Sequence, residues 1–179
     1  LSIVPELQVD RTQVDPSRVA AKGIELSISG DWRGNEFWLN YTRAEVEETI
    51  DGSRVRRSSD QKHATNIGWS RQFRDWQIAV ESTYHSGWPT TQLTLDSSGN
   101  AEQTIRNDRR LSHYLTVDAK GTRQWELNHS KLRLEIGVTN LFNRNNVIGT
   151  EYEMSNGLLK NSDRKALPIA PFIDLFYSF

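Results

Sequence analysis

Hydrophobic and polar residues alternate in short runs along most of this chain, and turn-forming clusters separate the runs. In the clearest run, residues 131–138, the apolar side chains occupy one parity and the charged side chains the other. Successive side chains of a β-strand point to opposite faces, so this period of two predicts strands with one apolar and one polar face. The same pattern predicts further strands at residues 23–30, 36–46, 63–73, 76–87, 114–127, 148–154 and 171–179, and it indicates no helix.

The connections between these strands are of two lengths. Short turns are expected at residues 30–35, 73–75 and 139–145, and long polar loops at residues 47–62, 88–112 and 155–166. Short turns at one end and long loops at the other are typical of an up-and-down outer-membrane barrel. In this assignment the turn Asn128–Ser130 is an exception that falls on the outer side. The Asp96–Asn100 cluster predicts a small hairpin inside the second long loop.

The alternation fits two kinds of β-protein. A soluble sandwich turns its apolar faces inward, whereas a membrane barrel turns them to lipid and encloses its polar face. The aromatic residues favour the barrel, because most of them lie near strand ends, as in the girdles at the two membrane interfaces. The last strand favours it too, because an end held in the wall can seal a barrel. Its barrel-sealing residues share one parity and are Ile173, Leu175, Tyr177 and Phe179.

Composition narrows the picture only slightly. Hydrophobic residues make up 36% of the chain, and no run approaches the ~18–20 apolar residues of a membrane helix. A membrane β-strand needs only ~9–11 residues, half of which face lipid, so low hydropathy does not exclude a barrel. The absence of cysteine excludes a disulfide scaffold and a thiolate metal site. The net charge of -1 gives no field that would attract nucleic acid.

Several stretches occur in an order that is typical of one family. They are AAKGIELSISG (Gly23, Glu25), FWLNYTRAE, YLTVDAKG (Asp118), IGVTNLFNRNN (Asn140, Leu141, Phe142, Asn143) and the terminal FIDLFYSF. Through this set the chain resembles the C-terminal part of a TonB-dependent outer-membrane receptor. The resemblance marks Asn140–Asn143 as a periplasmic turn motif and gives counterparts for RSSDQKHA, YHSGWPTT and RNDRR.

The resemblance implies an all-β fold in which eight or nine strands form a C-terminal partial segment of a larger antiparallel transmembrane β-barrel. Residues 1–179 are then expected to be barrel wall and outer loops of a longer chain, without the plug domain and the N-terminal region that contacts TonB. The implied location is the cell outer membrane. The implied function is TonB-energised uptake of a scarce nutrient such as a ferric siderophore, cobalamin or a saccharide, without covalent chemistry or a cofactor. The implied partners are outer-membrane lipid, lipopolysaccharide, the barrel-assembly machinery, TonB and the nutrient, with no nucleic acid.

Two other functions remain open at this stage. A small passive outer-membrane barrel would close with eight strands, and a soluble β-sandwich that binds carbohydrate would show the same periodicity. The first would need no plug, and the second would dissolve without detergent.

Few residues have the arrangement of a chemical site. The four histidines, His63, His85, His113 and His129, have no metal-ligand spacing and are expected at the rim or in the lumen. Asp118, Lys120, Arg133 and Glu135 share the polar parity and predict a mixed-charge lumen lining in preference to an acid–base pair. Arg54, Arg56 and Arg57, in the first long loop, are candidate contacts for an anionic ligand, with lipid A phosphates or solvent as the alternative.

Overall fold

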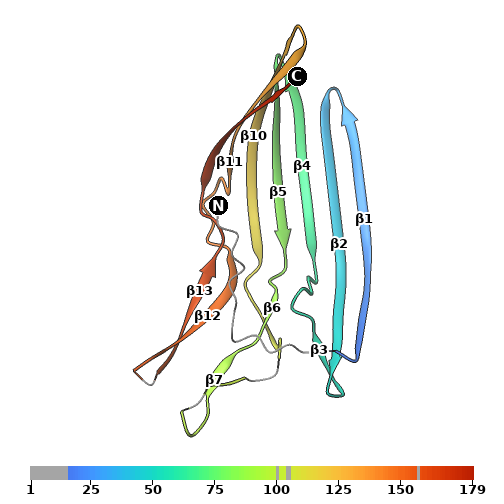
Figure 1. Cartoon of the computed structure of the whole chain (residues 1–179). Coiled ribbons are helices and arrows are strands. Elements are labelled where there is room, and N and C mark those ends of the chain that lie inside the picture. The colour runs from blue at the N-terminus through green and yellow to red at the C-terminus, as the bar shows by residue number, and fades with distance from the viewer. Residues whose placement is uncertain (1–15, 100, 104–105, 157) are drawn as a thin grey trace.

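A computed structural model describes residues 16–99, 101–103, 106–156 and 158–179, which form strands and connections only. Seven strands make one continuous antiparallel wall, and β3 (Ser53–Arg56) pairs with β2 beside it (Figure 1). The wall strands, in spatial order, are β1 (Arg18–Trp32), β2 (Asn35–Ile50), β4 (Ala64–Phe73), β5 (Trp76–His85), β10 (Tyr114–Leu127), β11 (Ser130–Thr139) and β14 (Ala170–Ser178). The prediction of an all-β fold with an antiparallel sheet of about eight strands is confirmed.

The remaining six strands form three separate hairpins or strand pairs outside the wall. β12 (Val147–Ser155) pairs with β13 (Leu158–Lys165), β6 (Pro89–Thr90) with β9 (Arg109–Arg110), and β7 (Leu93–Leu95) with β8 (Ala101–Gln103). The predicted small hairpin is therefore present between β7 and β8, where the Gly99 amide donates to the Asp96 carbonyl over 3.1 Å. Asn100, its last expected residue, lies outside the described residues.

The two ends of the wall differ in their connections. Residues 33–34, 74–75 and 128–129 make the tight-turn end, where the chain also terminates, and residues 51–63, 86–113 and 140–169 make the loop-bearing end (Figure 1). The predicted side is wrong for two segments: Asn128–Ser130 lies with the tight turns, and the 139–145 segment with the long loops. The physical reason is that β6 to β9 pair with one another outside the wall. The chain therefore enters and leaves the 86–113 loop at the same end, and β10 runs antiparallel to β5. The next turn, after β10, thus lies at the tight-turn end.

Two predicted loops contain strands. The expected loop 47–62 begins later, because β2 continues to Ile50 and turns through Asp51 and Gly52 into β3. The expected polar loop 155–166 is mostly β13. Both missed strands are polar on their two faces, so they carry no alternation of hydrophobic residues that sequence analysis can detect.

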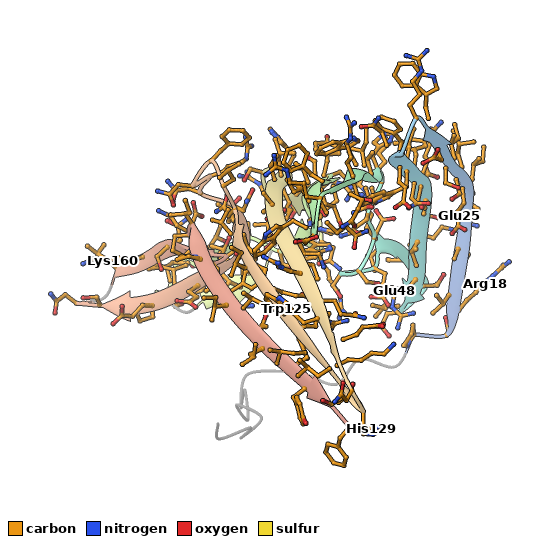
Figure 2. All side chains as sticks on the ribbon, turned by 90° about the horizontal axis from the view of Figure 1, so that it is seen from above. Arg18, Glu25, Glu48, Trp125, His129 and Lys160 are labelled. Atoms are coloured by element: carbon orange, nitrogen blue, oxygen red, sulfur yellow. The ribbon has the colours of Figure 1, made fainter. Side chains whose placement is uncertain are left out.

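One face of the wall is apolar and exposed, and we call it the convex face because the strands follow an arc when viewed along the wall (Figure 2). Ile24 is 70% exposed and Ile173 is 72% exposed, although both lie in the middle of strands. Cross-strand partners continue the apolar face from strand to strand; they include Ile28–Leu39, Leu39–Ile67, Leu134–Leu175 and Ile136–Ile173. This is the face that the sequence predicts for lipid.

No hydrophobic residue within the described ranges is buried, so this sheet has no core of its own. The described strands include no second sheet packed against the apolar face, as a β-sandwich would require. β1 and β14 do not pair with each other, so the described strands do not close into a small eight-stranded barrel either. None of the described residues forms a helix that is long and apolar enough to cross a membrane.

Aromatic side chains mark the limit of the apolar face at the tight-turn end. Trp32 and Phe73 are the last residues of β1 and β4, and each carries the guanidinium of the following arginine over its ring, at 5.0 Å for Arg33 and 5.7 Å for Arg74. Amphipathic side chains of this kind stabilise the boundary between an apolar layer and water. β5, with 10 residues, is long enough for one membrane crossing, which needs ~9–11.

Gly68 marks a close approach on the opposite, concave face of the wall. A Cβ built on Gly68 would overlap the six-membered ring of Trp38, its cross-strand neighbour on β2. The Trp38 ring lies over this glycine, and its Nε1 donates a hydrogen bond to Asn66 Oδ1 over 2.9 Å. An aromatic ring that covers a strand glycine is a recognised way of filling the missing side-chain volume.

We expect Gly68→Ala to destabilise the folded wall by ~1–3 kcal/mol, because Trp38 must leave its position and its hydrogen bond. Gly30→Ala is the matched control, since a Cβ there meets nothing within 4 Å. Urea unfolding in detergent measures the free energy of unfolding of both variants. The gel mobility of unheated samples reports the folded fraction at each urea concentration. The double variant with Trp38→Ala should restore most of the loss, and a Gly68→Ala protein as stable as Gly30→Ala would contradict this packing.

Candidate functional site: the concave wall and the loop-bearing end

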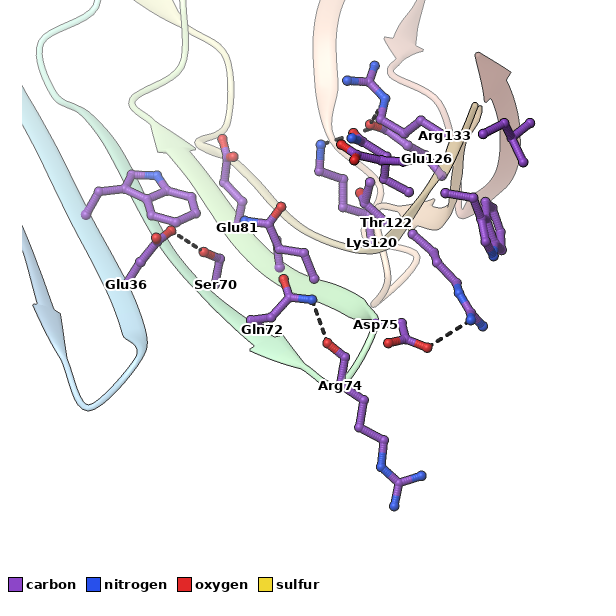
Figure 3. A pocket seen from close by; sticks show the side chains of 18 residues that line it. Glu36, Ser70, Gln72, Arg74, Asp75, Glu81, Lys120, Thr122, Glu126 and Arg133 are labelled. Carbon is purple, nitrogen blue, oxygen red and sulfur yellow. Dashed lines mark hydrogen bonds and ion pairs between the residues drawn. The ribbon is translucent and has the colours of Figure 1, made fainter. Parts of the chain in front are cut away.

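The concave face carries the polar residues of the wall and forms an open groove near the tight-turn end (Figure 3). Its lining comes from β2, β4, β5, β10 and β11, and it includes Glu36, Ser70, Glu81, Lys120 and Thr122. The period of two places these side chains on the face opposite to the apolar one. The groove is therefore open to water and mostly polar, unlike the apolar pocket that binds a typical small molecule.

Opposite charges alternate along the part of the groove formed by β10 and β11. Glu135 lies between Lys120 Nζ at 3.9 Å and Arg133 Nε at 3.3 Å, and its side chain is only 16% exposed. The guanidinium of Arg133 also lies 4.3 Å from the ring centre of Phe176. Phe172 and Phe176 share the inward parity of the final strand, and Phe176 covers an arginine. The predicted mixed-charge lining is confirmed for these three charged residues.

Asp118, the fourth predicted member of this lining, has a different role. Its carboxylate accepts a hydrogen bond from the Asn140 amide over 2.7 Å, which ties β10 to the segment after β11. The carboxylate therefore fixes the backbone at the loop-bearing end.

Asn140 and Asn143 organise the connection from β11 to the last hairpin. Both have left-handed backbones, with φ of 51° and 49°, a conformation that asparagine tolerates better than most residues. The Asn140 side chain is 2% exposed; it donates to the carbonyls of Arg144 and Leu167 and accepts from the Arg144 amide. Asn143 accepts from the Ile169 amide just before β14.

The other two residues of this motif point to the surface, since Leu141 is 40% exposed and Phe142 is 74% exposed. The hydrogen bonds of the motif join β10, β11 and the start of β14, at the end opposite to the tight turns. A periplasmic turn at this position does not fit the strand directions, which group it with the long loops.

A buried ion pair joins the two long loops that follow β2 and β5. The Asp60 carboxylate is 2% exposed as a residue; it accepts the Val46 amide over 2.7 Å and pairs with the Arg110 guanidinium. Arg110 also donates to the carbonyls of Asp60 and Gly87 at 2.9 and 3.0 Å. Sequence analysis missed this pair, although RSSDQKHA and RNDRR, the stretches that contain the two residues, were among the stretches of the resemblance.

A second set of contacts supports the same loops. Asn107 donates from its side chain to the Arg56 carbonyl over 2.6 Å, and Arg106 lies 3.3 Å from the nearly buried Glu48. These contacts cross about fifty residues of sequence. They tie the long loops to one another at the loop-bearing end of the wall.

The histidines lie at the rim as predicted, apart from His129, and three of them have aromatic neighbours. His85 stacks between Tyr114 and Trp88, with ring centres 4.7 and 4.8 Å apart. His63 Nδ1 lies 2.8 Å from the Tyr41 hydroxyl. His113 lies beside Tyr84 and bonds to Arg144, whereas His129 is in a tight turn at the opposite end (Figure 2). Within the described ranges no three histidine, aspartate or glutamate residues gather as a metal site would require.

The three loop arginines do not form a common site. Arg54 and Arg56 lie on β3 opposite Thr49 and Glu47, so their side chains share the outward parity of β2. Arg57 follows the strand, and its amide donates to the Val46 carbonyl over 3.0 Å. All three side chains are exposed. Two of the three arginines are therefore on the convex side and point away from the groove.

The sequence of this wall matches a known protein family. Residues 7–141 match the family described as TonB dependent receptor-like, beta-barrel. The chain belongs to this family. Membership in the TonB-dependent receptor-like barrels implies a place in the outer membrane and a part in transport, in a family of transporters and not of enzymes. Comparisons with curated proteins and with solved structures gave no match.

The match explains the two-faced wall in this receptor-family barrel. Lipid surrounds the apolar convex face, and the charged groove belongs to the interior. The matched residues also include all of β1 to β11, so the Asp60–Arg110 ion pair lies within the match.

Proposed function

We propose that this chain forms the C-terminal wall and outer loops of a receptor that takes up a scarce, bulky nutrient with energy delivered through TonB. A ferric siderophore, cobalamin or a saccharide is the class of cargo we expect. The observation that carries the proposal is the polar, charged groove on the inner face of a wall whose outer face is apolar.

Among the described residues, no second strand pairs with the outer edge of β1 or of β14, which supports a larger barrel. Lipid cannot satisfy the backbone groups of an open strand edge, so further strands must pair with both. We propose that they belong to the same receptor, and that Ile173, Leu175, Tyr177 and Phe179 lie on the lipid face of the sealing strand. A plug domain against the groove, TonB and the barrel-assembly machinery complete the proposed set of protein partners.

The fixed loops at the other end support a role in nutrient capture. The Asp60–Arg110 pair and the stacked His85, Trp88 and Tyr114 give a cross-linked, aromatic rim at the end of the wall opposite to the groove. Arg57 is the loop arginine that we keep as a candidate contact for an anionic chelate.

Nutrient-limited growth tests the proposal. We expect a strain that depends on this receptor to grow on one of three sole sources, a ferric chelate, cobalamin or an oligosaccharide, and to lose that growth when the gene is deleted. Uptake should saturate and stop when the proton-motive force is collapsed. Uptake that continues after the collapse would identify a passive barrel and refute the proposal.

A further inference from the structure

A polar hollow lies between two strand pairs at the loop-bearing end, and we call it the hairpin hollow. One side is the β6–β9 pair of the 86–113 loop, and the other is the β12–β13 hairpin (Figure 1). Its volume is about 310 Å³, at the small end of the range of ~300–1,000 Å³ for ligand pockets. It shares no lining residue with the groove on the concave face.

The strand register places polar cross-strand pairs on both sides of the hairpin hollow. Two pairs come from the hairpin, and they lie on one face of it because their positions are two residues apart on each strand. The third pair joins β6 to β9. The three pairs are Thr150–Asp163, Tyr152–Asn161 and Thr90–Arg109.

One hydrogen bond joins the two sides of the hairpin hollow. The Tyr152 hydroxyl donates to the carbonyl of Thr91, next to β6, over 3.4 Å. Tyr152 is half-buried and borders the hollow, so this bond lies at the hollow itself. The two strand pairs, about sixty residues apart in sequence, are therefore held next to each other.

Several polar side chains of the hairpin hollow are available to a ligand. The guanidinium of Arg109, the carboxylate of Asp163, the amide of Asn161 and the hydroxyl of Thr150 line it. None of these four groups makes a hydrogen bond or an ion pair with any residue that the structure describes. The guanidinium only donates, the carboxylate only accepts, and the amide and the hydroxyl do both. A matching ligand must therefore carry donors and acceptors close together.

This set of groups favours a polyhydroxy ligand. Each hydroxyl of a sugar both donates and accepts, so neighbouring hydroxyls satisfy a guanidinium and a carboxylate at the same time. The charges of Arg109 and Asp163 cancel, and Asp60 neutralises Arg110, which also borders the hollow. The hollow thus has no excess charge that would select an anion. The Tyr152 ring adds an apolar surface for the C–H face of a sugar ring.

We propose that the hairpin hollow is a capture site for one unit of a saccharide. Asn161 and Asp163 accept hydrogen bonds from adjacent sugar hydroxyls, and Arg109 donates to the same unit from the opposite side. The inference rests on the proposed uptake function and names saccharides as the cargo among its three classes. It also requires the 86–113 loop and the β12–β13 hairpin together, because neither side alone carries the whole set of groups.

Glycan binding by the intact protein, purified in detergent, tests the proposal. An array of neutral oligosaccharides identifies the tightest probe, and isothermal titration then measures its affinity. We expect the double variant Asn161→Ala, Asp163→Ala to bind this probe about 50-fold more weakly, because it removes one charged and one neutral hydrogen-bond partner. Arg109→Gln should weaken binding about tenfold from the other side of the hollow.

The matched control is the double variant Glu151→Ala, Ser162→Ala. These two residues are direct partners on the opposite face of the same hairpin, so the control also removes a carboxylate and a small polar group. It should leave the affinity unchanged. The gel mobility of unheated samples should show that all variants stay folded, because the side chains they lose have no partner among the described residues.

Four outcomes would overturn the proposal. They are an array on which no glycan binds, unchanged affinity in the Asn161, Asp163 variant, an equal loss in the control, and unchanged affinity in Arg109→Gln. Growth of the receptor-dependent strain on a ferric chelate or cobalamin, and not on an oligosaccharide, would also overturn it. Because glycan binding is measured on the purified protein, its failure leaves the proposed uptake function intact.

Discussion

Asp60→Ala is expected to make trypsin cleave the 86–113 loop about a hundredfold faster, while the wall stays folded. The substitution leaves the Arg110 guanidinium, which is 24% exposed, without its carboxylate, and it leaves the Val46 amide without an acceptor. Removing one partner of a buried ion pair costs ~3–5 kcal/mol, and we expect the lower value because Arg110 keeps some contact with water. The rate of proteolysis is proportional to the population of the opened loop. A loss of ~3 kcal/mol therefore raises the cleavage rate about a hundredfold.

Two further variants distinguish the loss of the ion pair from the loss of a negative charge alone. Asp108→Ala removes an exposed carboxylate from the same loop and should leave the cleavage rate unchanged. The double variant Asp60→Ala, Arg110→Met removes both charges and should recover part of the protection. If cleavage after Arg106 and Arg109 is no faster in Asp60→Ala than in wild type, the pair does not hold the two loops together.

Ile136→Arg is expected to destabilise the wall by ~2–4 kcal/mol, the cost of an arginine at the middle of the lipid-facing surface. Ile136 is 40% exposed and lies beside Ile78 and Gly121 on the convex face, between the aromatic boundary and the loop-bearing end. Its cross-strand partner on β14 is Ile173. No acidic residue is paired with it across β10 or β14, so the new charge would meet lipid alone.

The matched control places the same charge on the other face of the neighbouring strand. Thr122 lines the groove, and Glu135 is its direct partner on β11. Thr122→Arg should therefore be nearly neutral or slightly stabilising, since an arginine directly opposite a carboxylate makes a favourable cross-strand pair. Unfolding in lipid vesicles measures both variants. Equal losses for Ile136→Arg and Thr122→Arg would mean that the convex face is not the lipid face.

Sequence analysis located the wall strands well because their two faces meet different surroundings. The alternation in residues 63–73 and 131–138 predicted β4 and β11 to within a residue or two, and it placed Arg133 and Glu135 on the inner face. A one-residue slip in register would exchange the two faces, so the pattern is under strong physical constraint. The small hairpin after Asp96 was found from its turn residues alone.

What sequence analysis missed lies where both faces of a strand meet water. β3 and β13 have no apolar face, so nothing in their residue pattern distinguishes them from loops. The side of Arg54 and Arg56 follows from the register of β3 with β2, which no local pattern encodes. The Asp60–Arg110 pair joins residues fifty positions apart, and only the fold brings them together.

The hydrogen bonds around Asn140 have a consequence for how the sequence of such a protein can diverge. The base of the β12–β13 hairpin is closed by the Ala166 amide on the Asn146 carbonyl at 2.8 Å and by Asn140 on the Leu167 carbonyl at 3.0 Å. Beyond this base the hairpin makes one further hydrogen bond, from the Tyr152 hydroxyl to the Thr91 carbonyl at 3.4 Å, and Lys160 lies near its tip (Figure 2). Insertions, deletions or a grafted epitope in the hairpin would leave the docking of the final strand undisturbed. Mutation can thus remodel the hairpin while the pairing of the wall strands is inherited without change.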